Sequence, residues 1–311
     1  MRVLVAGATG AVGLSLIPAL LSRGHVVAGL ARNPGAVEPL GAQPIQADAL
    51  QRDTVIRSVR DFAPDAIVHQ LTALPSTMDL MRFDRVFEQT NRLRTKGTEI
   101  LLEAARSAGV KRFVAQSFCG WPYARTGPLV KTEADELDPN PPARLRTTLD
   151  AIRRLETTVV GARDVAGTIL RYGGFYGPHT HLGRGGSMTE QVRRRRVPVI
   201  GDGGGVWSFC HIADVASATV KAVESDATGV FNVVDDDPAP VATWLPFLAK
   251  TMGAPPPRRL PMWIARLILP EHLRAIMTEA RGGSSELFRR TFDWTPKYPS
   301  WRQGFVAEFG A

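Results

Sequence analysis

Short runs of apolar residues alternate along the chain with longer stretches in which apolar positions recur every three or four residues. The short runs have the length of buried strands, and the longer stretches have the period of helices. The strand-like runs are Val3–Ala6, His25–Leu30, Pro44–Ala47, Ala66–Leu71, Arg112–Gln116 and Gly229–Val234, and the helical stretches include Arg52–Phe62, Asp79–Ala108 and Arg144–Ala162. This alternation predicts an α/β fold with a doubly wound parallel sheet.

A glycine-rich turn, Gly7-Ala8-Thr9-Gly10-Ala11-Val12-Gly13, follows the first run and precedes a helical stretch that stops at Gly24. In such a turn one glycine permits the tight turn, one lets the backbone approach a pyrophosphate, and one lets the helix pack close to the strand. The helix N-terminus then favours the anion. We expect a dinucleotide site formed by Gly7, Thr9, Gly10, Ala11, Val12 and Gly13. A glycine turn in an α/β domain without a nucleotide is the alternative.

Arg32 follows the second strand-like run and indicates which dinucleotide binds. A domain that prefers NAD places Asp or Glu at this point to hold the adenosine ribose hydroxyls. A guanidinium can instead hold a 2′-phosphate through charge-assisted hydrogen bonds. The sequence therefore predicts NADP(H) as the cofactor, with a surface arginine that opens a loop as the alternative.

The carboxyl ends of the strands are where ligands collect in sheets of this kind. The residues expected to border the cofactor there are Asp48, Ala49, Leu71, Thr72, Ala73, Gln116 and Ser117. Asp48 would accept a hydrogen bond from the adenine amino group or would cap the helix Arg52–Phe62, and capping alone would explain it.

The composition is that of an ordinary globular protein. Of 311 residues, 44% are hydrophobic and 22% are charged, enough for one large domain or a main domain with a smaller one. The net charge of +8 raises nucleic acid as a partner, but the basic residues are dispersed except at Arg193–Arg196. We therefore expect no nucleic-acid partner and interpret that run as a solvated helix end.

Cysteine content and hydropathy suggest a cytoplasmic protein without a membrane partner. Cys119 and Cys210 are too few for a disulfide framework. No stretch offers about 20 unbroken apolar residues, and the repeated glycines and Pro18 argue against a signal peptide. His179 and His181 have too few accompanying ligands for a metal site.

Motifs through most of the chain resemble the extended short-chain dehydrogenase/reductase superfamily, in its NAD-dependent epimerase/dehydratase-like branch. The matching segments are the glycine turn, Asp48-Ala49-Leu50, Asn91 with Gly97-Thr98, Arg112–Ser117, Leu170–Pro178, Gly201–Gly203 and Phe209–Ala216. The resemblance implies a Rossmann-type fold. It also implies that a segment containing Tyr172, Gly174 and Phe175 passes near the nicotinamide, although Tyr176-Gly177-Pro178 also suits a structural turn.

The same resemblance implies a catalytic Tyr, with a Lys four residues later that lowers the Tyr pKa for proton exchange. In that family a Glu often follows the Lys by another four residues. When Glu156 is placed on that Glu, Thr148 takes the position of the Tyr and Ile152 that of the Lys. Neither can do that chemistry, so an atypical member is expected. Ser117 and Thr148 would then only hydrogen-bond the reacting oxygen. The family also has a serine at this strand end, and one alignment puts Phe118, rather than Ser117, at its position. Tyr123 is a further candidate for the proton donor, with loop packing as its alternative role.

Two lobes are expected. Residues 1–176, joined by 206–236, would form the dinucleotide-binding domain, and residues 177–205 and 237–311 a smaller, discontinuous, mainly helical substrate lobe. Aromatic residues that border the cleft, or that equally well pack in the core, are Trp121, Tyr123, Phe175, Tyr176 and Trp207.

These features together predict an NADPH-dependent ketoreductase for a bulky aromatic or polyketide-like ketone. The proton would come from the substrate's own neighbouring hydroxyl or from water. A nucleotide-sugar epimerase or dehydratase and a non-catalytic NADP(H)-sensing regulator are the alternatives. The expected partner is a small-molecule substrate, and the expected state is a monomer or a homodimer.

Overall fold

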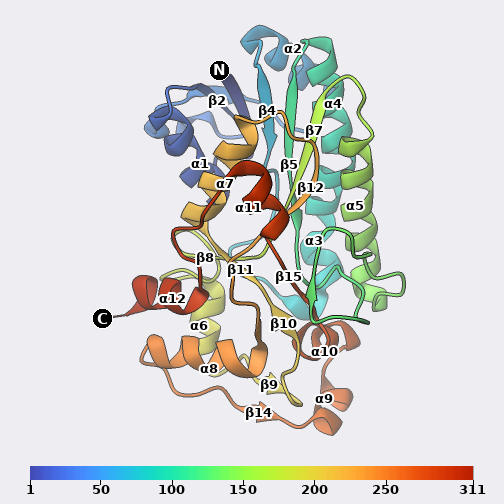
Figure 1. Ribbon diagram of the computed structural model, residues 1–311, viewed down its shortest axis with the longest axis vertical. Coiled ribbons are helices and arrows are strands. Elements are labelled where there is room, and N and C mark those ends of the chain that lie inside the picture. The colour runs from blue at the N-terminus through green and yellow to red at the C-terminus, as the bar shows by residue number, and fades with distance from the viewer. Residues whose placement is uncertain (311) are drawn as a thin grey trace.

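The computed structural model describes residues 1–310, which are built around a seven-stranded parallel sheet (Figure 1). The strand order is β12-β7-β5-β4-β1-β2-β3, so the chain begins inside the sheet and winds outward in both directions. The strands are β1 (Arg2–Ala6), β2 (Val26–Ala31), β3 (Gln43–Gln46), β4 (Ala66–His69), β5 (Arg112–Phe118), β7 (Ala166–Tyr172) and β12 (Gly229–Val233). The predicted doubly wound sheet is thus confirmed.

Helices cover both faces of the sheet because side chains alternate along each strand. Val3 and Val5 of β1 lie in one core layer, and Leu4 and Ala6 lie in the other. The first layer is covered by α1 (Ala11–Ser22), α7 (Ile212–Val223) and α11 (Glu286–Phe292). The second is covered by α2 (Arg52–Phe62), α4 (Thr98–Ser107) and α5 (Ala143–Val160). The predicted bounds of α2 are those observed.

The stretch expected as one helix from Asp79 to Ala108 is interrupted. After a 3₁₀ turn at Leu80–Arg82 it runs as α3 (Phe83–Arg92), then as a π-helical segment (Leu93–Gly97), and then as α4. Helix α4 lies beside the sheet, whereas α3 lies nearer the smaller lobe (Figure 1). The hydrophobic pattern does not reveal the π-helical segment. That segment lengthens the backbone of the helix, but it adds no stripe of apolar residues that the sequence could show.

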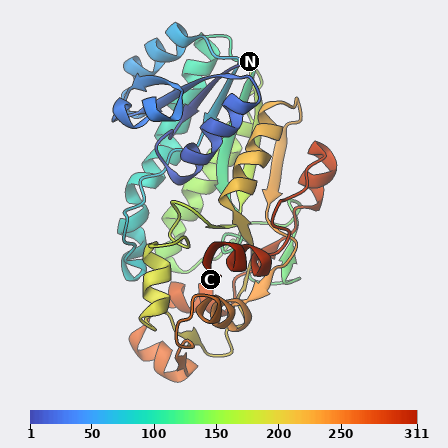
Figure 2. The ribbon, with the colours of Figure 1, turned by 90° about the vertical axis from the view of Figure 1, so that its left-hand side faces the viewer.

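A smaller, mainly helical lobe fills the lower part of both views, where the orange helices lie (Figures 1 and 2). Its core includes Tyr176, Phe209, Trp244 and Trp301. Its helices are α6 (Ser187–Arg193), α8 (Val241–Thr251), α9 (Met262–Ile268), α10 (Glu271–Thr278) and α12 (Trp301–Phe309). The remaining short strands are β6 (Val130–Lys131), β8 (Gly174–Tyr176), β9 (Val199–Ile200), β10 (Val206–Trp207), β11 (Phe209–His211), β13 (Ala239–Pro240), β14 (Arg259–Leu260) and β15 (Gly282–Gly283).

The expected lobe 237–311 needs a correction at α11. Phe288, Phe292 and Trp294 pack in the same core layer as α7 and Phe231 of β12. This segment therefore completes the cover of the sheet, because its apolar side chains meet the layer that α1 and α7 leave open. Across residues 1–310, no helix combines the length and the apolar composition needed to cross a membrane.

Candidate active site

The turn between β1 and α1 has a shape that only glycine allows. Gly7 has a φ of +96°, and a Cβ on it would lie 2.6 Å from the carbonyl oxygen of Gln70. A Cβ on Gly13 would lie 2.4 Å from the carbonyl oxygen of Ala8. Gly10, which precedes α1, is exposed together with Thr9, so the N-terminus of α1 is open to solvent. Among the neighbouring predicted residues, Ala11 is half-buried and the side chain of Val12 lies in the core.

Arg32 and Asp48 follow neighbouring strands at this edge of the sheet. Arg32 comes directly after β2 and is exposed. The Oδ1 atom of Asp48 accepts a hydrogen bond from the Leu50 amide across 2.9 Å, whereas the residue that precedes α2 is Gln51. Of the two roles expected for Asp48, the capping of this helix is therefore wrong, because its carboxylate accepts from the turn that precedes the helix. Ala49 is buried.

The loop after β4 is held from two sides. The amide of Leu71 donates to Nδ1 of His69 across 3.3 Å, and the amide of Ala73 donates to Oγ1 of Thr90 on α3 across 3.0 Å. Thr72 between them is exposed. The loop therefore lies close to the glycine turn, which touches Gln70, and is fastened to α3.

A buried ion pair occupies the carboxyl ends of β5 and β7. Arg171 of β7 donates to the two carboxylate oxygens of Glu156 on α5, across 2.8 Å from Nε and 2.6 Å from Nη2. Ser117 of β5 donates its hydroxyl to Oε1 of Glu156 across 2.6 Å and is 2% exposed. Gln116 is half-buried on the opposite face of the strand. The structure therefore engages Ser117 with α5 rather than leaving its hydroxyl free at the surface.

Tyr123 and Tyr172 are also buried with their hydroxyls engaged. The Tyr123 hydroxyl donates to Asn232 across 2.7 Å and accepts from Nη1 of Arg171 across 3.1 Å. The Tyr172 hydroxyl lies 2.7 Å from Oγ1 of Thr219 on α7, inside the sheet layer. Burial raises the pKa of both phenols, so neither has the properties of an exposed proton donor. The adjoining residues Gly174 and Phe175 are half-buried in β8.

Thr148 and Ile152 point into the protein from α5. Thr148 is fully buried, and its Oγ1 accepts a hydrogen bond from Nδ2 of Asn91 across 3.0 Å. Ile152 is 1% exposed. In addition, none of the four tyrosines of the sequence is followed by a lysine four residues later. The two α5 positions therefore supply no titratable group.

Aromatic rings from α3, from the end of β5 and from the loop after β5 form a cluster. Phe83 stacks on Phe87 with ring centroids 4.3 Å apart and meets Trp121 edge to face at 5.7 Å. The ring centroids of Phe118 and Trp121 lie 6.3 Å apart. Of the aromatic residues singled out in the sequence, Trp121 belongs to this cluster, whereas Tyr176 and Trp207 pack with the core of the smaller lobe. The sequence pattern missed Phe83 and Phe87, whose spacing on a helix equally suits ordinary core packing.

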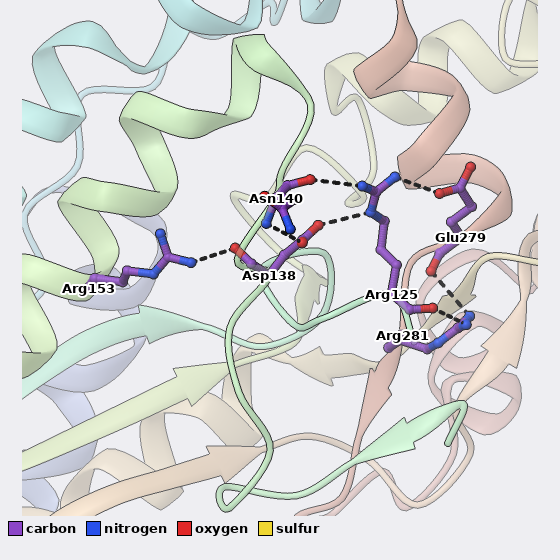
Figure 3. A network of polar contacts seen from close by, with 6 residues as sticks. All are labelled: Arg125, Asp138, Asn140, Arg153, Glu279 and Arg281. Atoms are coloured by element: carbon purple, nitrogen blue, oxygen red, sulfur yellow. Dashed lines mark hydrogen bonds and ion pairs between the residues drawn. The ribbon is translucent and has the colours of Figure 1, made fainter. Parts of the chain in front are cut away.

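A polar network fastens the loop beyond Trp121 to the smaller lobe (Figure 3). Its members are Arg125, Asp138, Asn140, Arg153, Glu279 and Arg281. Arg125 donates to Asp138 across 2.9 Å and to Glu279, which follows α10, across 2.6 Å. Arg281 donates to the carbonyl oxygens of Arg125 and Glu279. The network therefore joins the two lobes beside the aromatic cluster.

Arg94 is a further charged residue at the site, and it gave no signal in the sequence. It lies in the π-helical segment, is 7% exposed, and its guanidinium carbon is 6.0 Å from the Phe87 ring centroid. Burial lowers the pKa of Arg94 to about 10, while the charge of Glu156 opposes that shift. At neutral pH the site therefore contains a buried positive charge next to the aromatic cluster.

Two curated proteins and one solved structure illustrate what the chain resembles. It is 43% identical over 310 residues to a 3-diazoavenalumate denitrifying reductase from a Streptomyces species, covering 99% of this chain and 100% of that protein. It is 29% identical to a 4-hydroxy-2-methyl-3-oxo-4-farnesyl-3,4-dihydroquinoline-1-oxide ketoreductase from Stigmatella aurantiaca, over 81% of this chain and 74% of that protein. A UDP-glucose 4-epimerase from Thermus thermophilus, crystallised with NAD, superposes with a TM-score of 0.74 at 26% identity, over 99% of this chain and 98% of the other.

The family comparison covers the sheet and its cofactor edge. The profile of the NAD dependent epimerase/dehydratase family matches residues 3–234, which is most of the chain. The protein therefore belongs to the NAD dependent epimerase/dehydratase family, within the extended short-chain dehydrogenase/reductase superfamily.

Proposed function

We propose that the protein is an NADP(H)-dependent reductase that transfers a hydride to a planar aromatic substrate. The observation that carries this proposal is the pair Thr148 and Ile152, which offers no acid where the family resemblance expects one. The similarity to a denitrifying reductase over the whole chain supports reduction rather than epimerisation. The cluster of Phe83, Phe87 and Trp121 supports an aromatic substrate.

The residues at the strand ends fit a nicotinamide dinucleotide, which supplies a hydride when bound. Gly7 and Gly13 form a cradle that a Cβ would fill, and the open N-terminus of α1 would hold the pyrophosphate. Exposed Arg32 would hold the 2′-phosphate. The loop Leu71–Ala73, fastened to α3, would border the cofactor beyond the glycine turn.

Proton balance favours an aromatic diazo group as the hydride acceptor. Reduction of a ketone adds a hydride to carbon and a proton to oxygen, so an acid must be supplied. Reductive loss of an aryl diazonium group forms a C–H bond with the hydride, breaks the C–N bond and releases dinitrogen without consuming a proton. The name of the Streptomyces relative refers to a diazo compound and to denitrification. Such a reaction suits a site in which Thr148 and Ile152 replace an acid.

A ketone is the second candidate, favoured by the similarity to the Stigmatella aurantiaca ketoreductase. Ser117, Thr148 and Tyr123 are all engaged in buried hydrogen bonds, so in this proposal they position neighbouring groups rather than donate the proton. The proton would come from a hydroxyl of the substrate or from water, which restricts the reaction to activated ketones, such as those beside a phenol.

The test offers the protein NADPH with either 3-diazo-4-hydroxycinnamate or 1-acetyl-2-naphthol. With NADPH deuterated at C4, we expect one deuterium at the ring carbon that carried the diazo group, and one dinitrogen per NADPH consumed, above the rate without protein. Turnover of the ketone alone would select the second candidate. Tight NADPH binding without turnover of either compound would contradict a reductase of this kind and favour the regulator.

A further inference from the structure

Arg94 carries a buried guanidinium group that lacks some of its hydrogen-bond partners within the protein. It is 7% exposed, and its Nη1 atom has no hydrogen-bond partner among residues 1–310. A guanidinium loses its hydration on burial, so buried arginines are ordinarily paired with an anion. An unpaired buried donor is therefore a position at which a ligand can supply what the protein does not.

The nearby carboxylate is already in use. Within the described chain, Glu156 is the carboxylate whose charge raises the pKa of Arg94. Both oxygens of Glu156 accept from Arg171, and Oε1 also accepts from Ser117. His69 at the end of β4 stays neutral near pH 7, because burial, aided by the charge of Arg94, lowers its pKa to about 4. Two guanidinium groups thus share one carboxylate, and positive charge is left over at the carboxyl ends of β4 and β5.

The π-helical segment places this arginine between α3 and α4. Wider turns of this kind change the rotation of one helical half relative to the other and frequently occur at functional sites. Ile100 and Leu101 keep α4 packed in the core layer of the sheet. On the other side of the segment, α3 carries Phe83 and Phe87 into the aromatic cluster. Arg94 lies where these two halves meet.

The positive charge and the rings are joined by successive pairwise contacts. The guanidinium of Arg94 lies 6.0 Å from Phe87, Phe87 stacks on Phe83 at 4.3 Å, and Phe83 meets Trp121 at 5.7 Å. Aromatic faces hold flat rings by stacking or edge contact. A guanidinium fork binds an oxyanion through charge-assisted hydrogen bonds. A guanidinium beside aromatic rings therefore suits a flat aromatic molecule that carries a negative oxygen at one end.

We propose that Arg94 binds an oxyanion, either a phenolate or a carboxylate, that the aromatic substrate itself carries. This inference rests on the proposed function for the aromatic nature of the substrate, but not on which acceptor group is reduced. Arg94 then selects acidic aromatic compounds, because a neutral one would leave the buried guanidinium without its partner.

The experiment measures binding to the NADP⁺ complex by isothermal titration calorimetry. The probe is 4-hydroxy-3-nitrocinnamate, in which both the carboxyl group and the acidic phenol are ionised. Its methyl ester retains only the phenolate, and 4-methoxy-3-nitrocinnamate retains only the carboxylate. The variants are Arg94→Met and Arg94→Lys, and the matched control is Arg92→Met, an exposed arginine on α3.

We expect Arg94→Met to lower the affinity for the doubly charged probe by about tenfold to a hundredfold. Arg94→Lys should lose less, because it keeps the charge without the fork, and Arg92→Met should lose nothing. Of the two singly charged compounds, the one that lacks the oxyanion bound by Arg94 should bind the wild type and Arg94→Met with equal affinity. The other should lose affinity in Arg94→Met, and the oxyanion that it retains, the phenolate or the carboxylate, is the one that Arg94 binds. The probe should also raise the Tm of the wild type more than that of Arg94→Met.

Three results would overturn the proposal. They are no binding of any probe to the wild type, an equal loss of all three compounds in Arg94→Met, and a loss of NADP⁺ affinity with the probe unaffected. The last would assign Arg94 to the cofactor. If Arg94→Met does not fold, the comparison of Arg94→Lys with the wild type decides. If the probe binds in a way that depends on Arg94, but neither the diazo compound nor the ketone is turned over, the proposed reductase function is contradicted and the anion site is retained.

Discussion

Ser117 donates its hydroxyl hydrogen to Glu156 across 2.6 Å, and the same carboxylate oxygen accepts from Arg171 across 2.8 Å. All three side chains are buried. The Ser117 hydroxyl at the end of β5 therefore helps to bind α5 to β7 through the shared Glu156 carboxylate. Removing one partner of such a pair leaves an uncompensated charge in the interior.

Arg171→Met tests this arrangement. It should lower the free energy of unfolding by about 3 to 5 kcal/mol, because it removes the guanidinium that donates to both oxygens of the buried Glu156 carboxylate. Ser117→Ala removes only one hydrogen bond and should cost about 1 to 3 kcal/mol. Urea denaturation followed by circular dichroism measures both. A loss below about 1 kcal/mol for Arg171→Met would show that Glu156 finds other partners or is hydrated.

Arg32→Ala tests the cofactor preference. It should weaken NADPH by about 1.5 to 3 kcal/mol, because a charge-assisted contact with the 2′-phosphate is lost, and should leave NADH nearly unchanged. Fluorescence titration with each cofactor measures the two affinities. Equal losses for NADPH and NADH would contradict a 2′-phosphate contact.

Thr148→Ala tests whether the residue is the acid. Because its hydroxyl is buried and bonded to Asn91, turnover should fall by no more than about tenfold, well below the 10²- to 10⁴-fold associated with general acid catalysis. Thr147→Ala, at the exposed neighbouring position, is the control. A loss of a thousandfold or more, in a variant that folds and binds NADPH, would identify Thr148 as the acid.

Stability should fall between pH 6.5 and pH 4 because of His69. Burial lowers the pKa of His69 to about 4, so in this range the unfolded chain takes up a proton that the folded protein does not. The stabilisation is present above pH 6.5 and is lost as the pH falls toward 4, by up to about 3 kcal/mol. Urea midpoints at several pH values measure the slope, to which His211 also contributes. His69→Asn should flatten it, and an unchanged slope in that variant would exclude His69 as the cause.

Features that depend on neighbouring residues in the sequence could be predicted. The glycine turn and α2 each depend on a short sequence pattern. Only glycine fits the space at positions 7 and 13, and the apolar residues of Arg52–Phe62 recur with a helical period. The sheet follows from the alternation of strands and helices. In each case the signal and the structure it specifies lie within a few turns of the chain.

Features that depend on distant contacts could not be predicted. Whether Ser117 or Tyr123 faces a ligand or the core depends on Glu156, Arg171 and Asn232, which approach only in the folded sheet. Arg94 resembles any helical arginine until the π-helical segment and the occupied Glu156 are known. The segment at α11 covers the sheet although it lies in sequence between α10 and α12, which both belong to the smaller lobe.

The ion pair between Glu156 and Arg171 also bears on which positions of α5 can change. The pair stabilises the junction of α5 with the sheet through side chains at and beyond position 156, whereas Ile152 and Thr148 lie about one and two turns earlier, respectively, on the same helix. Mutations at those two earlier positions therefore remove neither partner of this ion pair. A helix anchored at this point can therefore accept other side chains at positions 148 and 152 while it stays attached to the sheet.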